Sequence, residues 1–222
     1  MCWDAAARQD TSASLCELFR HQDMLQFRIE REALRHGGGI HPKHRLTGYH
    51  EFFCSRVRPG EKVLDVGCGY GAVAKSLCDA GAIVTAIDID MENVRRARLR
   101  FGDSGILFLE ADATRFLPAD SFDVAVLSNV LEHIRDRQTF LQQILEQATP
   151  TRCLLRVPAE TRDWTIPLRR ELGLPHFSDP THFIEYTEET FQREMADAGL
   201  EIREMLSRWG EIWAEVIPRA TR

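Results

Sequence analysis

The stretch that decides the fold of this chain is Lys62-Val63-Leu64-Asp65-Val66-Gly67-Cys68-Gly69-Tyr70-Gly71. Its first half is a short apolar run rich in β-branched residues, which is typical of a buried strand. Three alternating glycines then end the strand in a sharp turn, whose backbone can approach a ligand more closely than a Cβ would allow. Residues 72–80 have the composition and period of a helix. Strand, glycine turn and helix in this order are typical of the entry to a nucleotide-type site.

The same alternation continues toward the C-terminus. Apolar runs at residues 83–87, 106–110, 122–127 and 153–157 predict four further strands, and residues 91–101 and 131–146 predict helices between them. This pattern predicts a parallel sheet covered on both faces, with its ligand crevice at the carboxyl ends of the strands. A helix at 187–199, capped by Thr187, and two strands at 200–206 and 212–217 would complete the chain.

Two segments stand apart from this alternation. We predict an N-terminal helical cap or lid over residues 1–59: a loose start at 1–10, helices from residue 11 to the glycines at 37–39, and a helix at 46–56. The core would span residues 60–222. Within the core, residues 158–186 are rich in Pro, Arg, His and Trp and lack a clear period, so we predict an insert on the substrate side.

Composition narrows the class of protein. The chain has 222 residues, of which 44% are hydrophobic and 28% charged, as in ordinary globular proteins. Its formal net charge of −6 argues against a general nucleic-acid binder. No apolar run approaches the roughly 18 residues of a membrane span, and the N-terminus lacks the features of a signal peptide. The six scattered cysteines, without a CxxC pair, predict reduced thiols in a cytoplasmic protein and no zinc site.

The glycine turn alone leaves its ligand open. Gly67-x-Gly69-x-x-Ala72 satisfies the dinucleotide fingerprint, which does not separate NAD from other adenosine ligands. Asp65, however, lies at the end of the strand, where a protein that binds a pyrophosphate would gain nothing from an anionic side chain. An acidic group there suits a cationic ligand, such as one that carries an ammonium and a sulfonium group.

Taken together, residues 63–71, Asp88, Asp112 and residues 121–134 resemble the class I S-adenosylmethionine-dependent methyltransferases of the small single-domain type. The resemblance covers residues 60–157, and the helix and hairpin at 187–217 agree with the last elements of that family. It implies an α/β fold of three layers, Rossmann-like, with a doubly wound sheet of seven strands and an N-terminal helical lid. The last strand would be antiparallel and inserted between its neighbours.

The resemblance also implies a cofactor site for S-adenosylmethionine, with S-adenosylhomocysteine as the product. Asp65, through water, and the backbone of residues 67–71 would hold the methionine moiety, where Arg45 or Tyr49 could also meet its carboxylate. Asp88 would accept hydrogen bonds from both ribose hydroxyls. Ile89, Asp112 and Ala113 would contact the adenine. The predicted cofactor residues are Asp65, Gly67, Cys68, Gly69, Gly71, Asp88, Ile89, Asp112, Ala113, Ser128 and Asn129.

The segment Leu131-Glu132-His133 follows the fourth strand and leaves three interpretations open. His133, the predicted catalytic residue, could act as general base on a hydroxyl. Ubiquinone-pathway and small-RNA 2′-O-methyltransferases carry E-x-x-E-H here and bind a divalent metal. This chain has Asn129 in place of the first carboxylate, so we predict no metal site. Alternatively, Glu132 and His133 only cap and orient the following helix.

The insert supplies the candidate acceptor residues. Arginines beside aromatic rings suit an anionic or sugar-like substrate, although the insert could equally be a solvated connection. The predicted substrate residues are Arg162, Trp164, His176, His182 and Tyr186. We therefore expect methyl transfer to an oxygen, or as second choice a nitrogen, of a small-molecule or sugar-like acceptor, with no nucleic acid as partner. The alternatives are an NAD(P)-binding oxidoreductase and a non-catalytic S-adenosylmethionine-binding module.

Overall fold

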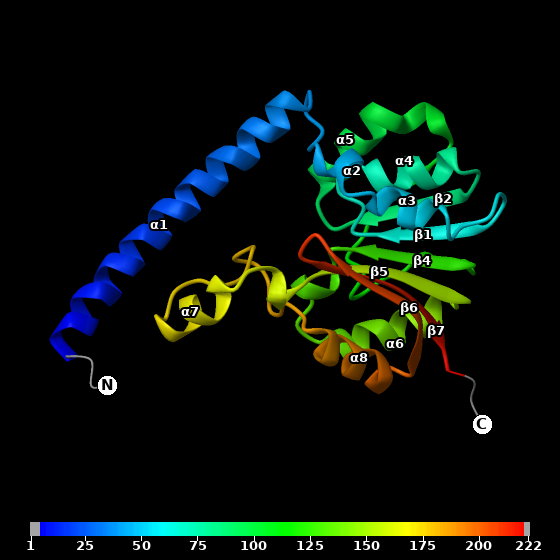
Figure 1. Cartoon of the computed structure of the whole chain (residues 1–222). Coiled ribbons are helices and arrows are strands. Elements are labelled where there is room, and N and C mark those ends of the chain that lie inside the picture. Colours follow the sequence, from blue (N-terminus) through cyan, green and yellow to red (C-terminus); the bar gives the residue numbers. More distant parts are fainter. Residues whose placement is uncertain (1–4, 220–222) are drawn as a thin grey trace. The chain divides into compact units, whose positions relative to one another are not determined.

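The computed structural model describes residues 5–219, with side chains from residue 11 onward (Figure 1). A single sheet has the order β3-β2-β1-β4-β5-β7-β6. Its strands are β1 (Lys62–Val66), β2 (Ile83–Asp88), β3 (Leu107–Glu110), β4 (Val124–Ser128), β5 (Arg152–Pro158), β6 (Leu200–Arg208) and β7 (Glu211–Pro218). The first five strands pair in parallel, whereas β7 runs antiparallel between β5 and β6. The predicted seven-stranded doubly wound sheet is confirmed.

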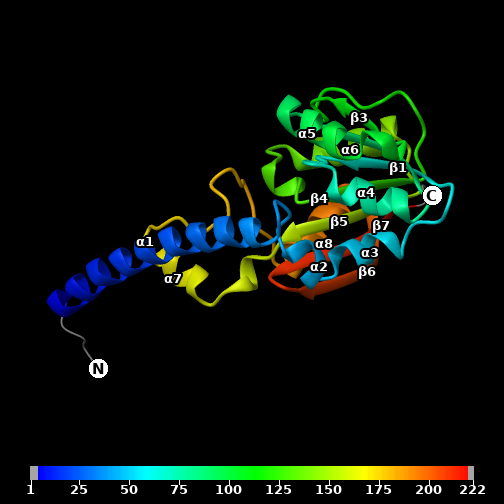
Figure 2. The ribbon, with the colours of Figure 1, turned by 90° about the horizontal axis from the view of Figure 1, so that it is seen from above.

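Helices cover both faces of the sheet, which gives the predicted three layers (Figures 1 and 2). One face carries α3 (Tyr49–Cys54), α4 (Ala72–Asp79) and α5 (Met91–Phe101), and the other carries α6 (Arg137–Gln147) and α8 (Glu188–Asp197). Alternate strand residues supply the two cores: Val63 packs with the first group of helices and Leu64 with the second. This period of two follows from the pleat of a strand that is buried on both faces.

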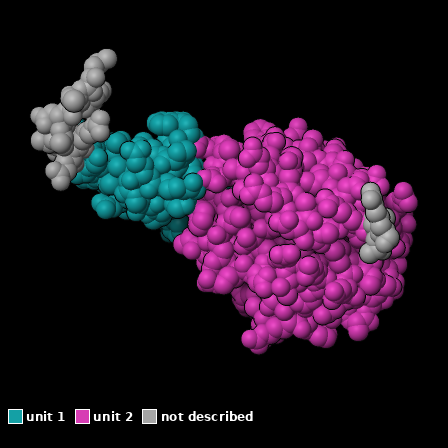
Figure 3. Space-filling model, turned by 90° about the horizontal axis from the view of Figure 1, so that it is seen from below, with its two compact units in different colours: residues 1–48, 164–176 teal, residues 49–163, 177–222 magenta. Residues whose placement is uncertain are grey.

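The chain divides into two compact units (Figure 3). The larger unit, residues 49–163 and 177–222, contains the sheet. The smaller unit, residues 1–48 and 164–176, contains α1 (Ala5–His36), α2 (Lys43–Leu46) and α7 (Thr165–Glu171). In it the buried Arg169 of α7 pairs with Asp23 of α1 at 2.7 Å, and its guanidinium lies 4.4 Å from the centre of the Phe19 ring. The predicted division into a lid at 1–59 and a core at 60–222 stays a prediction.

Three local predictions differ from the structure. Helix α1 begins at Ala5, so only residues 1–4 of the expected loose start lie outside the described residues. The helix expected at 46–56 is two helices, separated by Gly48 at φ +80°. The helix expected at 131–146 begins instead as a 3₁₀ turn, Leu131–His133, and α6 starts at Arg137. The reason is Asp136, whose side chain caps α6 by accepting from the Thr139 N–H at 3.1 Å.

The insert at 158–186 contains α7 and a 3₁₀ turn, Glu160–Arg162. Its two ends are joined to each other. Ala159 and Tyr186 form an isolated parallel bridge, in which the Glu160 N–H donates to the Tyr186 carbonyl and the Tyr186 N–H donates to the Pro158 carbonyl. The Ala159 N–H also donates to the carbonyl of Gly210, in the β6–β7 turn. The ends of the insert are therefore fixed to the sheet.

Candidate functional site

The glycine turn after β1 has a conformation that only glycine adopts readily. Gly67, Gly69 and Gly71 have φ values of +67°, +53° and +78°. A Cβ on Gly67 would lie 2.7 Å from Cγ2 of Val130, and one on Gly71 would lie 2.9 Å from the ring of Phe108. The turn is therefore restricted to glycine by its backbone and, at these two positions, by its neighbours.

Asp88, at the end of β2, holds this turn in place. Its Oδ2 accepts from the Gly69 N–H at 2.8 Å, and its Oδ1 accepts from the Asp90 N–H at 2.9 Å and from Asn93 Nδ2 at 3.1 Å. A carboxylate offers about four lone-pair sites, so Asp88 keeps acceptor capacity after these three bonds. It is a structural part of the turn as well as a candidate ribose ligand.

Asp65 is a buried carboxyl group with an unsatisfied oxygen. The residue is 1% exposed, and its Oδ2 has no hydrogen-bond partner among the described residues. Burial and then the nearby Asp88 raise the pKa of Asp65 to about 8, although the Ala74 N–H opposes the shift. An unsatisfied buried acceptor is costly, so the structure supplies at this position an acidic group that a cation would stabilise.

The predicted adenine residues lie beyond the ends of β2 and β3. Ile89 is 68% exposed, so an apolar surface is available there to a flat ring. Oδ1 of Asp112 accepts from the Thr114 hydroxyl at 2.6 Å and from the Thr114 N–H at 3.0 Å, and the hydroxyl is the main cause of its lowered pKa. Ala113 is partly buried beside it. Ionised, half-exposed Asp112 is thus able to accept a further donor.

The carboxyl ends of β4 and β5 hold a charged group that the prediction omitted. Arg156 is buried, pairs with Glu211 through its Nε at 2.7 Å, and donates to Ser128 Oγ at 3.1 Å. Its guanidinium lies 3.9 Å from the centre of the Tyr49 ring. An arginine inside the apolar run 153–157 was the available sequence signal, because a buried strand excludes a charge that has no partner.

A second buried carboxyl group follows β4. Glu132 is fully buried, and neither carboxylate oxygen has a hydrogen-bond partner among the described residues. Burial raises the pKa of Glu132 to about 8. Asn129, which has a φ of +58°, likewise has a buried Oδ1 without a partner among those residues.

Two histidines lie beside Glu132. The rings of His133 and His182 meet edge to face, with centroids 4.6 Å apart. One ligand atom from each of Glu132, His133 and His182 lies within 4.8 Å of the other two. A carboxylate and two imidazoles at this spacing can hold a metal ion. The structure thus brings together the predicted catalytic residue and one predicted substrate residue, in a site where the sequence predicted no metal.

The other predicted substrate residues are dispersed. Arg162 forms an ion pair with Glu185 in the larger unit. Tyr186 is fully buried, and its hydroxyl donates to Glu194 at 2.7 Å, which favours a packing role. Trp164, 79% exposed, and His176, 3.3 Å from the Leu174 carbonyl through its Nδ1, belong to the smaller unit. Their roles toward an acceptor stay predictions.

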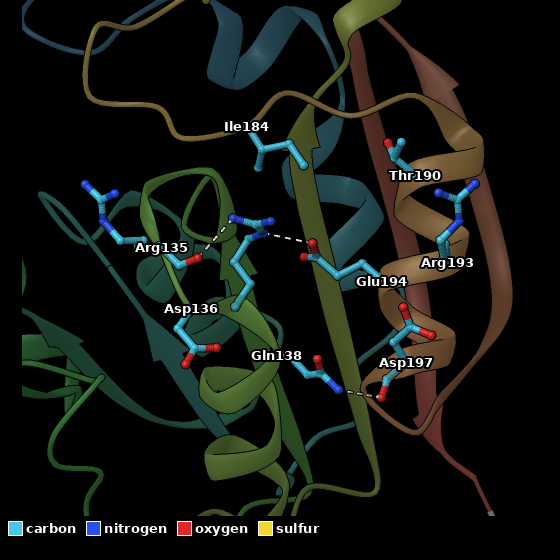
Figure 4. Close-up of a pocket in the computed structure, with 9 residues that line it drawn as sticks. Arg135, Asp136, Gln138, Ile184, Thr190, Arg193, Glu194 and Asp197 are labelled. Carbon is cyan, nitrogen blue, oxygen red and sulfur yellow. Dashed lines mark hydrogen bonds and ion pairs between the residues drawn. The ribbon is translucent and has the colours of Figure 1, made fainter.

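A surface pocket of about 300 Å³ lies elsewhere, between the start of α6 and α8 (Figure 4). The ion pair between Arg137 and Glu194, 2.8 Å long, crosses it. It is lined by Arg135, Asp136, Arg137, Gln138, Ile184, Thr190, Arg193, Glu194 and Asp197. Since none of the predicted site residues lines this pocket, it is separate from the candidate site.

Comparison with known proteins agrees with this geometry. Residues 64–151 match the family model of the methyltransferase domain. An uncharacterized methyltransferase of Mycobacterium bovis is 44% identical over 89 residues, 40% of this chain and 45% of that protein. A ubiquinone biosynthesis O-methyltransferase of Pectobacterium atrosepticum is 33% identical over 120 residues, 51% of this chain and 50% of that protein. The chain thus spans about half the length of these curated relatives.

Solved structures share the fold at low sequence identity. A small RNA methyltransferase superposes with a TM-score of 0.64 at 18% identity, over 79% of this chain and 25% of that chain. A magnesium protoporphyrin IX methyltransferase from Synechocystis, with SAH bound, superposes with a TM-score of 0.62 at 19% identity, over 79% of this chain and 86% of that chain. Residues 64–151 therefore match a methyltransferase domain, and the chain shares its fold with these methyltransferases, in agreement with the predicted resemblance.

Proposed function

We propose that this chain is an S-adenosylmethionine-dependent methyltransferase that acts on an oxygen, or as second choice a nitrogen, of a small-molecule or sugar-like acceptor. The observation that carries the proposal is Asp65, a buried carboxyl group with an unsatisfied oxygen beside the glycine turn of a methyltransferase domain. A dinucleotide pyrophosphate there would oppose ionisation of Asp65, whereas the cationic methionine end of S-adenosylmethionine would stabilise its ionised form. The same residue disfavours the oxidoreductase alternative.

The other predicted cofactor residues would each bind a different part of S-adenosylmethionine. Asp88 has acceptor capacity left for ribose hydroxyls, and Asp112, an ionised acceptor, is available to the adenine amino group. The exposed side chain of Ile89 would pack on the ring. When bound, S-adenosylmethionine supplies a methyl group already activated by its sulfonium, so the chain contributes mainly alignment and exclusion of water.

The acceptor is inferred from charge and from a relative. A formal net charge of −6 disfavours a polyanion, and a relative that matches about half of the chain is a ubiquinone biosynthesis O-methyltransferase. The structural likeness to a small RNA methyltransferase makes RNA the second candidate acceptor.

The expected cytoplasmic location is supported by the cysteines of the described residues. All of these are free thiols: Cys16, Cys54, Cys68, Cys78 and Cys153. Among the described residues, no helix is long and apolar enough to cross a membrane.

As a general base, His133 would take the proton of the acceptor on one ring nitrogen. Its Nδ1 contacts the Thr181 hydroxyl at 2.9 Å, which leaves Nε2 of this exposed side chain for a substrate proton. A general base needs this geometry and a pKa near neutrality. The structure also places His182 and Glu132 beside the ring, and these support a different use of the same nitrogen, developed below.

Two measurements test the proposed function. Differential scanning should show that S-adenosylhomocysteine at about 100 times its Kd stabilises the protein by about 2.7 kcal/mol, whereas NAD gives no shift. A panel assay of S-adenosylhomocysteine release should then find turnover with hydroxylated metabolites and none with RNA. Stabilisation by NAD alone would establish the oxidoreductase. Cofactor binding without turnover on any class of acceptor would favour the non-catalytic module.

A further inference from the structure

The Glu132–His133–His182 cluster has a feature that packing does not explain. Both oxygens of Glu132 are buried without a hydrogen-bond partner among the described residues, although two imidazoles lie beside them. Side chains that pack for stability alone satisfy their polar atoms, because each buried atom without a partner costs roughly 1–3 kcal/mol. A carboxylate directed at two imidazoles, with its own oxygens open, is arranged to receive something between them.

The hydrogen bonds around the cluster fix which nitrogen of each histidine keeps its lone pair. Thr181 donates its hydroxyl hydrogen to Asp179 Oδ1 at 2.5 Å, so its oxygen accepts from Nδ1–H of His133 at 2.9 Å. Nδ1–H of His182 donates in the same way to Glu185 Oε1 at 3.1 Å. Each ring therefore carries its proton on Nδ1 and presents the lone pair of Nε2.

This is the arrangement by which proteins orient histidine ligands. An outer carboxylate or hydroxyl that accepts from one ring nitrogen sets the tautomer and the orientation of the other. The outer groups here are anchored in turn. Glu185 also accepts from the Ser178 hydroxyl at 2.6 Å, and Asp179 accepts from the Thr181 N–H at 2.8 Å. Both histidines have such support: His133 ends the 3₁₀ turn after β4, and His182 lies in the irregular part of the insert.

We propose that Glu132, His133 and His182 form a binding site for a divalent transition-metal ion. Two neutral imidazoles and one carboxylate suit Mn²⁺, Co²⁺, Ni²⁺ or Zn²⁺, whereas Mg²⁺ prefers a shell of oxygens. Three protein ligands leave coordination positions for water or for an acceptor oxygen, and the exposed side of His133 gives them a route from solvent. His133 is then a ligand, which replaces its role as general base. Metal binding itself does not depend on the proposed transferase function.

The proposal is tested by metal binding to the full chain without cofactor. After removal of metal with a chelator, Mn²⁺ is titrated by calorimetry and by electron paramagnetic resonance. We expect one site per chain, and pulsed spectra that show couplings to two imidazole nitrogens. Glu132→Gln and His182→Asn should each weaken binding by at least about tenfold. His50→Asn is the matched control, because His50 is partly buried in the same unit and bonds Ser76 at 2.7 Å, outside the cluster.

The outcomes decide between metal site and packing cluster. Absence of Mn²⁺ and Zn²⁺ binding up to millimolar concentration would overturn the proposal. Mn²⁺ binding of unchanged affinity in Glu132→Gln and His182→Asn would also overturn it. Pulsed spectra without couplings to imidazole nitrogen would do the same. If a variant is not folded by circular dichroism, the nitrogen couplings of the wild-type protein decide alone. A failure of the proposed transferase function would appear separately, as absence of S-adenosylhomocysteine binding with the metal site intact.

Discussion

At the scale of the residue, the proposed contact of Asp65 with the cofactor predicts that cofactor affinity depends on pH. Its pKa of about 8 means that the group is mostly neutral at pH 7, and a cationic ligand favours its ionised form. Binding then releases a proton, so affinity rises with pH, by up to about tenfold per unit. We expect calorimetry to show S-adenosylhomocysteine binding more tightly at pH 7.5 than at pH 6. The gain levels off above about pH 8, where Asp65 is already ionised without ligand.

Asp65→Asn supplies the control for that measurement. The amide keeps the shape of the side chain but does not ionise, so binding should be weaker and should not change between pH 6 and pH 7.5. An equally steep pH profile in this variant would show that another group is responsible.

The same substitution should stabilise the free protein above acidic pH. Asp65 keeps its proton in the folded state up to a pH of about 8, whereas the unfolded chain releases it near its ordinary value of 3.8. Stability is therefore lost as pH rises through this interval. Urea unfolding should find Asp65→Asn more stable than wild type by roughly 1–3 kcal/mol at pH 7.5, with the gain absent at pH 4. A loss of stability at pH 7.5 would contradict the raised pKa.

Gly67 is restricted more strictly than an isolated turn glycine. Alanine at this position would combine a left-handed φ of +67° with a contact of 2.7 Å to Val130. Gly105 has a φ of +79° and nothing within 4 Å, so Gly105→Ala reports the backbone cost alone, about 1–2 kcal/mol. We expect Gly67→Ala to cost at least about 1 kcal/mol more in thermal unfolding. Equal costs would mean that Val130 moves aside freely.

At the scale of the element, the segment 179–185 orients both histidines of the proposed metal site. Thr181→Val keeps the shape of the side chain and removes the hydroxyl that fixes His133. Mn²⁺ affinity should fall by about 10–100-fold, as it does when outer-shell partners are removed. Thr151→Val, which removes a hydroxyl that donates to the Asp123 carbonyl at 2.8 Å, should leave affinity unchanged. Equal affinity in both variants would show that Thr181 does not orient a ligand.

Elements with a strong local pattern were predictable, and those that depend on distant partners were not. The strands around β1 follow from short continuous apolar runs, and α8 follows from its cap, Thr187. The predicted start of α6 was wrong because the Asp136 cap, rather than the apolar pattern that begins at Leu131, determines where the helix begins. The proximity of His182 to His133 was not predictable, because it depends on how an irregular segment returns to the end of β4.

At the scale of the whole molecule, the two proposed sites should be separable. The predicted cofactor residues Asp65, Asp88 and Asp112 share no member with the cluster of Glu132, His133 and His182. Asp65→Asn should weaken S-adenosylhomocysteine binding and keep Mn²⁺ binding, whereas Glu132→Gln should do the reverse. Effects on sites without shared partners are usually independent. For each ligand, the double variant should therefore lose the same binding free energy as the single variant that affects that ligand. A coupling above about 0.5 kcal/mol would instead join them into one site.

The anchored ends of residues 158–186 bear on how enzymes of this architecture diversify. The bridge between Ala159 and Tyr186, together with the bond from Ala159 to Gly210, closes the insert at its base. Substitutions, insertions or grafts between these two points can alter what the segment recognises while the sheet keeps its register. We therefore expect that exchange of residues between these anchors, with the segment 179–185 kept, can alter acceptor preference while the sheet and the proposed cofactor residues stay unchanged.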